Sequence, residues 1–183
     1  MTDSEKKQVE MHRDYHARCQ FAINNGLYLE AILMEYAAIE ARLETLCSIL
    51  SMPCGKACKY RKDVKISQRI SCLCAFRNKN KEVFETTKLS PNFYSDKGEL
   101  RNWIRLRDQR VHGLYKDEEK YRVRIEENKI IAENGYEYSK LLYNETRRIR
   151  RLKEKHKDKF ANVIFDCKSK NCKGNPQKYP KEL

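Results

Sequence analysis

The chain has 183 residues and a formal net charge of +13, and this positive charge lies beyond residue 50. Residues 1–50 carry five basic and eight acidic side chains, whereas residues 51–183 carry 34 basic and 18 acidic ones, a field that favours polyanions such as nucleic acid. No apolar run reaches the ~18–20 residues of a membrane span and the N-terminus lacks the apolar stretch of a secretory signal, so we expect a cytoplasmic protein with reduced cysteines and no membrane partner.

The apolar periodicity predicts an all-α protein, a bundle of four to five helices. The helices are expected over residues 6–24, 27–51, 63–77, 96–113 and 136–159. Asn24-Asn25-Gly26 is typical of a helix C-terminus, and Asp96 followed by Glu99 resembles a capping box at the start of the fourth helix. Between the third and fourth helices we expect a loop.

Two segments depart from the helical pattern. In YRVRIEENKII, apolar and charged residues alternate, which predicts a short β-hairpin near residues 120–132. From Asp166 onward the chain is polar and basic. We therefore expect one helical domain over residues 1–165 and a C-terminal tail over residues 166–183.

The stretch LRNWIRLRDQRVHGLY, residues 100–115, places an arginine within an apolar helix face. At about 100° per residue, four apolar side chains occupy one arc: Leu100, Trp103, Ile104 and Val111. Arg107 falls near the middle of this arc. A guanidinium cannot lose its charge, so burial there is costly unless it is paired.

The helix expected over residues 27–51 carries a complementary carboxylate. Glu40 falls inside the apolar arc of this helix, whereas its other glutamates fall beyond the margins of that arc. We therefore expect Glu40 and Arg107 to pair. Two interpretations remain open: a salt bridge that fixes packing, or a carboxylate that orients Arg107 toward a phosphate.

His112 follows Arg107 by five residues, at the end of the same predicted helix. It lies one turn after Asp108, a carboxylate that can hold an imidazole in one tautomer and favour its protonated form. The spacing alone is not specific, because Arg151 and His156 share it within a run of charged residues. A histidine in the last turn of a helix also suits the helix dipole.

The segment RDQRVHG resembles the R-x4–6-H motif of HEPN domains, in which a polar residue, here Asp108, follows the arginine. As in those domains, the motif closes a late helix of an all-α bundle and follows a stretch with Ile and Trp, here LRNWIRL. The run EYAAIEARLETL is similar to the second HEPN helix. The resemblance covers roughly residues 6–160.

The resemblance implies a metal-independent endoribonuclease that needs no cofactor. His112 would act as a general acid or base around the 2′-hydroxyl and the leaving oxygen, and Arg107 would stabilise charge on the scissile phosphate. Asp108 would position one of them. Two HEPN protomers usually pair so that both motifs line one cleft, which implies a homodimer acting on RNA. Many family members are toxins or phage-defence proteins, which implies an antitoxin or regulatory partner.

A departure and an alternative accompany this resemblance. In the toxins that are paired with a minimal nucleotidyltransferase, a tyrosine follows the motif histidine by two residues. Here Leu114 holds that position and Tyr115 comes one residue later, so control by nucleotidylation is in doubt. Some HEPN domains keep the fold as non-catalytic modules. A helical module that binds RNA or a protein partner is therefore the alternative.

The last predicted helix contains the basic run TRRIRRLKEKHKDK. Its candidate RNA-binding residues are Arg147, Arg148, Arg150 and Arg151. Such residues bind phosphates without reading sequence. The same run is equally consistent with a solvated face.

A structural zinc site is a rival interpretation of the cysteines. Its candidate ligands are Cys54, Cys58, Cys167 and Cys172. Neither pair has the more usual two-residue gap, and more than a hundred residues separate the pairs. We therefore assign no metal to the candidate site.

The remaining cysteines and two histidines fall within predicted helices. We expect Cys19, Cys47, Cys72 and Cys74 in or near the core. His12 and His16 are one turn apart on the first helix. We expect them at the surface of the bundle or at an interface, with a metal pair as the alternative.

Overall fold

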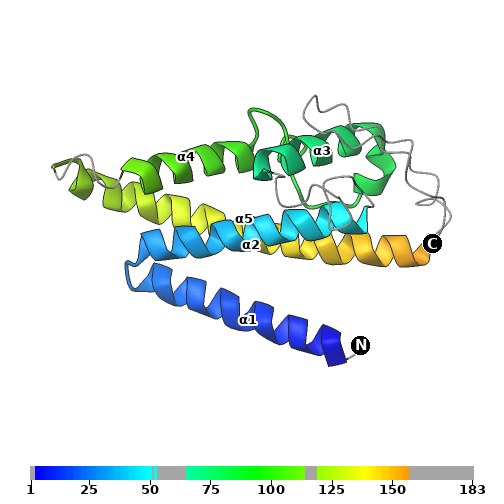
Figure 1. The fold of residues 1–183 in the computed structure, drawn as a ribbon, viewed down its shortest axis with the longest axis horizontal. Coiled ribbons are helices and arrows are strands. Elements are labelled where there is room, and N and C mark those ends of the chain that lie inside the picture. The colour runs from blue at the N-terminus through cyan, green and yellow to red at the C-terminus, as the bar shows by residue number, and fades with distance from the viewer. Residues whose placement is uncertain (1–2, 51, 53–64, 114–118, 157–183) are drawn as a thin grey trace. The chain divides into compact units, whose positions relative to one another are not determined.

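The computed structural model describes residues 3–50, 52, 65–113 and 119–156. Within these ranges the chain forms five α-helices and one short 3-10 helix, and no strand. They are α1 (Asp3–Asn24), α2 (Tyr28–Ile49), α3 (Ile66–Lys79), η2 (Lys81–Phe84), α4 (Glu99–Gly113) and α5 (Glu119–Lys155) (Figure 1). The expectation of an all-α protein is confirmed.

The turn between α1 and α2 is built on Gly26. Its φ is +74°, a left-handed conformation that glycine adopts without strain. The backbone N–H of Gly26 donates to the carbonyl of Ile23, and that of Leu27 donates to the carbonyl of Ala22. These two bonds are those of a Schellman motif, so the predicted helix C-terminus at this point is confirmed. The start of α2 consequently runs antiparallel to α1 (Figure 1).

The chain divides into two compact units. The first unit comprises Met1–Ile39 and Asn102–Lys140, and the second comprises Glu40–Arg101 and Leu141–Leu183. Helices α2, α4 and α5 each contribute residues to both units. The end of the expected domain at residue 165 and the expected tail over residues 166–183 lie outside the described residues.

Each unit has its own set of buried apolar side chains. In the first unit they are Cys19, Ala22, Ile23, Ala31, Ile32, Ile39, Trp103, Ile131 and Ala132. The second unit buries a larger set, which includes Leu43, Leu46, Cys47, Ile70, Leu73, Phe76, Phe93, Tyr94, Leu100, Leu142 and Ile149. Cys72 is also buried and Cys74 is half-buried, so the cysteines predicted in or near the core are confirmed there.

The predicted β-hairpin near residues 120–132 is wrong, because α5 is continuous from Glu119 to Lys155. Its buried residues recur at helical spacing: Asn128, Ile131, Ala132, Gly135, Ser139, Leu142, Glu145, Thr146 and Ile149. Ile125, one of the alternating apolar residues on which the hairpin rested, is exposed. A helical pattern over many turns therefore outweighed the short alternation on which the hairpin rested.

The start of α4 also differs from the prediction. The helix begins at Glu99, and Asp96 forms an ion pair with Arg101 at 3.2 Å instead of capping the helix. The carboxylate of Glu99 accepts a hydrogen bond of 2.6 Å from the hydroxyl of Ser90. The two acidic residues thus bind side chains on either side of the helix start, so the capping box does not form.

The segment before α4 is held against α3 within the second unit. Arg77 of α3 donates hydrogen bonds to the carbonyls of Ser90, at 2.6 Å, and Leu89, at 3.2 Å. Phe93 and Tyr94, whose rings contact edge to face, are buried, so they are not available for stacking on nucleic-acid bases. Within the described residues, no helix combines the length and the apolar character needed to cross a membrane.

Candidate functional site

Helix α4 is fixed in the first unit by Trp103. Its ring is buried, and its indole N–H donates a 2.7 Å hydrogen bond to the carbonyl of Ile131 on α5. A Cβ atom at Gly135 would lie only 2.6 Å from the ring, so glycine at this position allows the two helices to approach closely. One turn further along α4, Arg107 lies against Tyr36 of α2.

Arg107 is held by an aromatic ring and a carboxylate. Its guanidinium carbon lies 4.0 Å from the centre of the Tyr36 ring, and its Nη1 atom donates a 2.8 Å hydrogen bond to Oδ1 of Asp108. The side chain of Arg107 is 16% exposed and that of Asp108 is 48% exposed. Stacking and charge-assisted hydrogen bonding both restrict the planar guanidinium, which leaves Arg107 oriented rather than freely rotating.

Glu40, the predicted partner of Arg107, is bound elsewhere. Its carboxylate accepts a hydrogen bond of 3.4 Å from Nη1 of Arg69, and 42% of the side chain is exposed. The guanidinium of Arg69 is only 5% exposed and also lies 3.8 Å from Glu44. Glu40 and Glu44 of α2 therefore both lie close to the charge of Arg69, a residue of α3. The predicted pair is therefore not formed among the described residues, because Glu40 pairs with Arg69 and Arg107 pairs with Asp108.

The fully buried carboxylate of α2 is Glu35, which the helix wheel placed outside the apolar arc. The buried face of α2 is rotated toward Ala31 and away from Leu33, which is 46% exposed. Glu35 lies three residues after Ile32 and four before Ile39, both completely buried. This spacing would have predicted that Glu35 is buried, provided that the helix wheel centred the buried face on Ile32 and Ile39.

Burial raises the pKa of Glu35, because the charged carboxylate loses its hydration. Among the described residues, neither oxygen of this carboxyl group has a hydrogen-bond partner that would offset the rise. Burial also raises the pKa of the Tyr15 hydroxyl and that of the Cys19 thiol. These groups form a buried polar cluster in the first unit, and the raised pKa of the thiol disfavours a thiolate nucleophile there.

The C-terminal turns of α4 contain His112 and Arg110. The backbone of His112 belongs to the helix, but its side chain lies outside the described part of the structure. Arg110 forms an ion pair with Glu127 of α5. His112 is thus the second-last residue of α4, five residues after Arg107. The predicted action of its imidazole together with Arg107 stays a prediction.

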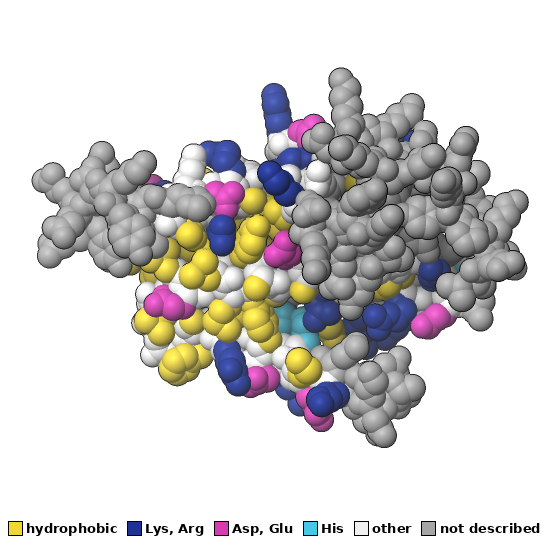
Figure 2. All heavy atoms as spheres, viewed as in Figure 1, with side chains coloured by type: hydrophobic (Ala, Val, Ile, Leu, Met, Phe, Trp, Pro, Cys, Tyr) yellow, Lys and Arg dark blue, Asp and Glu magenta, His cyan; other side chains and the backbone are white. Residues whose placement is uncertain are grey.

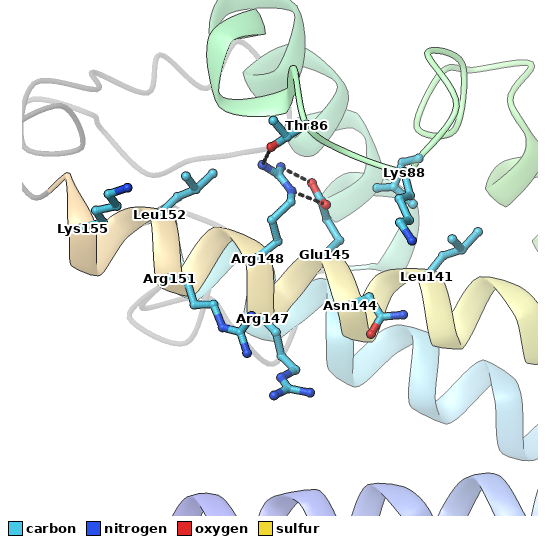
Figure 3. Close-up of a pocket in the computed structure, with 11 residues that line it drawn as sticks. Thr86, Lys88, Leu141, Asn144, Glu145, Arg147, Arg148, Arg151, Leu152 and Lys155 are labelled. Carbon is cyan, nitrogen blue, oxygen red and sulfur yellow. Dashed lines mark hydrogen bonds and ion pairs between the residues drawn. The ribbon is translucent and has the colours of Figure 1, made fainter. Parts of the chain in front are cut away.

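The four candidate RNA-binding arginines do not share one environment. Three of them, Arg147, Arg148 and Arg151, line a groove of about 390 Å³ in the second unit (Figure 3). Arg150 is not among the described residues that line this groove. The arginines of α5 are therefore divided by their orientation, which the sequence run RRIRR does not reveal.

The zinc alternative stays a prediction, and the structure describes only the histidine pair among the metal-binding candidates. Cys54, Cys58, Cys167 and Cys172, the candidate zinc ligands, all lie outside the described residues. Within the described part of the chain, no group of three or more His, Cys, Asp or Glu side chains could hold a metal ion. His12 and His16 are half-buried, and their Nε2 atoms share a hydrogen bond of 2.9 Å.

Charged and apolar side chains are mixed on the surface (Figure 2). Large apolar side chains that are exposed among the described residues all belong to the first unit: Met11, Phe21, Leu27, Leu33, Ile125 and Ile130. The first unit therefore carries both the candidate motif and the apolar surface that an association could bury.

Comparisons with models of protein families, with curated proteins and with solved structures gave no match to this chain. The residues of the site and the resemblance of the RDQRVHG motif are therefore the grounds for a functional proposal.

Proposed function

We propose that this chain is a cytoplasmic, metal-independent endoribonuclease of the HEPN type. Its site would comprise Arg107, Asp108 and His112 on α4. The observation that carries the proposal is the restraint on Arg107, whose guanidinium is stacked on Tyr36 and bonded to Asp108. Catalysis of phosphoryl transfer relies on cationic groups that are oriented before the reaction, so a held guanidinium suits this role.

In the proposed reaction the 2′-hydroxyl of RNA attacks the adjacent phosphorus, and the bond from phosphorus to the 5′-oxygen breaks. The products are a 2′,3′-cyclic phosphate and a 5′-hydroxyl. His112 would accept a proton from the 2′-hydroxyl or donate one to the leaving oxygen, a contribution typically of ~10²–10⁴-fold. Arg107 would bind the phosphate oxygens as negative charge develops on them. Asp108 would act by positioning Arg107, as its hydrogen bond suggests.

The active form would be a homodimer in which two α4 helices contribute to one cleft. The exposed apolar side chains of the first unit support this part of the proposal, because association could bury them. The biological role would be that of a toxin or phage-defence effector. Such an enzyme requires restraint in its own cell, which an antitoxin or regulatory protein would provide.

A second candidate function is a non-catalytic helical module that binds RNA or a protein partner. One observation favours it: Asp108 and Tyr36 already provide Arg107 with structural partners, and its side chain is only 16% exposed. In such a module Arg107 would stabilise the packing of α4 and would not contact a phosphate.

Cleavage of a mixed RNA pool in EDTA separates the two functions. We expect the wild-type protein to cut RNA without metal and to leave 2′,3′-cyclic phosphate ends. The variants Arg107→Ala and His112→Ala should both lose this activity while keeping the helical circular dichroism spectrum. Equal cutting by all three proteins would contradict the proposed site, and no cutting by folded wild type would favour the binding module.

A further inference from the structure

A cationic groove crosses the face of α5 in the second unit, where the chain segment 86–89 lies against the helix (Figure 3). Its volume of about 390 Å³ is within the range of small-molecule sites. Four cationic side chains line it in addition to Arg148: Lys88, Arg147, Arg151 and Lys155. Three leucines contribute apolar wall: Leu89, Leu141 and Leu152. The groove thus combines positive charge with an apolar surface.

Arg148 builds the groove but is not available to a ligand. Its Nε and Nη2 atoms donate to the two oxygens of Glu145, at 2.8 and 2.6 Å, and the carboxylate of Glu145 is only 3% exposed. Its Nη1 atom donates to the carbonyl of Val83 and the hydroxyl of Thr86. Arg148 therefore ties η2 and the segment that follows it to α5, and Glu145 neutralises its charge.

The remaining cations of the groove are not neutralised in this way. Arg147, Arg151 and Lys155 recur every four residues, so they lie along one face of α5. In Figure 3, Arg147 and Arg151 project beside one another, whereas Arg148 and Glu145 point toward Thr86. Within the described part of the chain, no carboxylate forms an ion pair with any of these three residues or with Lys88. The uncompensated charge of the groove is therefore positive.

We propose that this groove is an RNA exosite that binds a backbone phosphate through Arg147 and Arg151. Lys88 and Lys155 would extend the contact, and the nucleoside attached to that phosphate would pack against the leucines. The proposal rests on the proposed action on RNA and refines it. Of the four arginines suggested by sequence, it assigns Arg147 and Arg151 to the ligand and Arg148 to the fold.

Binding to a short strand tests the exosite without requiring cleavage. The probe is a fluorescent 2′-O-methyl RNA of about eight nucleotides, within the site size of single-strand binders, which the proposed nuclease reaction cannot cut. Anisotropy is measured in EDTA with the full-length protein at several salt concentrations. Arg147→Ala and Arg151→Ala are compared with Arg150→Ala, which removes the same charge from the adjacent position of the same helix.

We expect the two groove variants to bind about five- to tenfold more weakly than wild type, with a salt slope reduced by roughly 0.7 for each lost phosphate contact. Arg150→Ala should bind like wild type. Equal weakening of binding in all three variants would indicate general electrostatic attraction and would overturn the exosite. Wild-type affinity in both groove variants would also overturn the exosite. Adenosine monophosphate is the competitor: binding of this free nucleotide, but not of the strand, would overturn the assignment to RNA. Because the strand is not cleavable, loss of nuclease activity alone would leave the result unchanged.

Discussion

The guanidinium carbon of Arg107 lies 4.0 Å from the centre of the Tyr36 ring. This relationship joins α4 to α2 within the first unit, and it was not expected from the sequence, where Glu40 was the candidate partner. An arginine stacked on a ring keeps its hydrogen-bond donors in a plane, so they remain able to bind phosphate oxygens. Tyr36 is therefore a positioning residue in the proposed nuclease.

Replacing Tyr36 tests this role. We expect Tyr36→Leu to cut RNA about tenfold more slowly, because a cation–π contact of about 1–2 kcal/mol would no longer orient Arg107. Tyr36→Phe keeps the ring and should cut at nearly the wild-type rate. The measurement is the single-turnover cleavage rate in EDTA. A purely structural role for Tyr36 would instead lower the melting temperature of Tyr36→Leu and leave the rate of the folded protein unchanged.

The buried carboxyl of Glu35 should make stability depend on pH. Its pKa in the folded protein is raised by burial above the ordinary value of 4.5, so the folded state binds the proton more tightly than the unfolded state. The stabilisation is fully present below the unfolded pKa and is lost as pH rises through the folded pKa, by about 1.4 kcal/mol for each unit between them.

Urea unfolding across this pH range, compared with Glu35→Gln, measures the effect. The free energy of unfolding of wild type should fall as pH rises, and the variant should lack this part of the decline. The free energy of unfolding of Glu35→Gln should therefore increase relative to that of wild type as pH rises. Parallel curves for the two proteins would show that Glu35 does not titrate differently on folding.

Gly135 should not tolerate a methyl group. Helix propensity alone predicts that Gly135→Ala stabilises α5 by about 1 kcal/mol. The added Cβ would, however, lie 2.6 Å from the buried ring of Trp103, and overpacking of this kind typically costs about 1–3 kcal/mol. We expect a net loss of stability in chemical denaturation. Gly135→Ala should cost less stability in a Trp103→Leu background than in wild type. Equal costs in the two backgrounds would mean that the added methyl group does not clash with Trp103.

Arg148 and Arg151 should differ in their effect on stability although they lie three residues apart. Arg148→Met leaves the carboxylate of Glu145 buried without its partner, which we expect to destabilise the protein by about 3 kcal/mol. Arg151 is exposed, and Arg151→Met should change stability by no more than about 0.5 kcal/mol. Thermal unfolding of the two variants provides the comparison. Similar melting temperatures would contradict the structural role of Arg148.

Sequence reasoning was most successful where local chemistry determines the outcome. The end of α1 follows from Gly26, since a left-handed residue and two backbone hydrogen bonds are a local property. The hairpin was mispredicted because three alternating apolar residues were given more weight than the long helical spacing that begins at Asn128. Local propensity is a weak guide where packing over many turns decides the conformation.

The candidate site was only partly predictable. A helix wheel placed Arg107 on the inward side of α4, in agreement with its 16% exposure. The wheel could not identify its partners, because pairing depends on which helices meet and on small rotations about their axes. A similar rotation of α2 buries Glu35 and leaves Glu40 half exposed beside Arg69. Nor could the sequence separate Arg148, tied to Glu145, from its neighbours Arg147 and Arg151.

The most direct test of the proposed nuclease is the rate at which two matched variants cut one labelled RNA in EDTA. Arg107→Ala removes the guanidinium held by Tyr36 and Asp108. Arg105→Ala removes an exposed arginine of the same helix, which donates a hydrogen bond only to Asn102 among the described residues. The proposal predicts that Arg105→Ala cleaves RNA at the wild-type rate and that the cleavage rate of Arg107→Ala is lower by about 10²-fold or more. Equal rates for the two folded variants would contradict it.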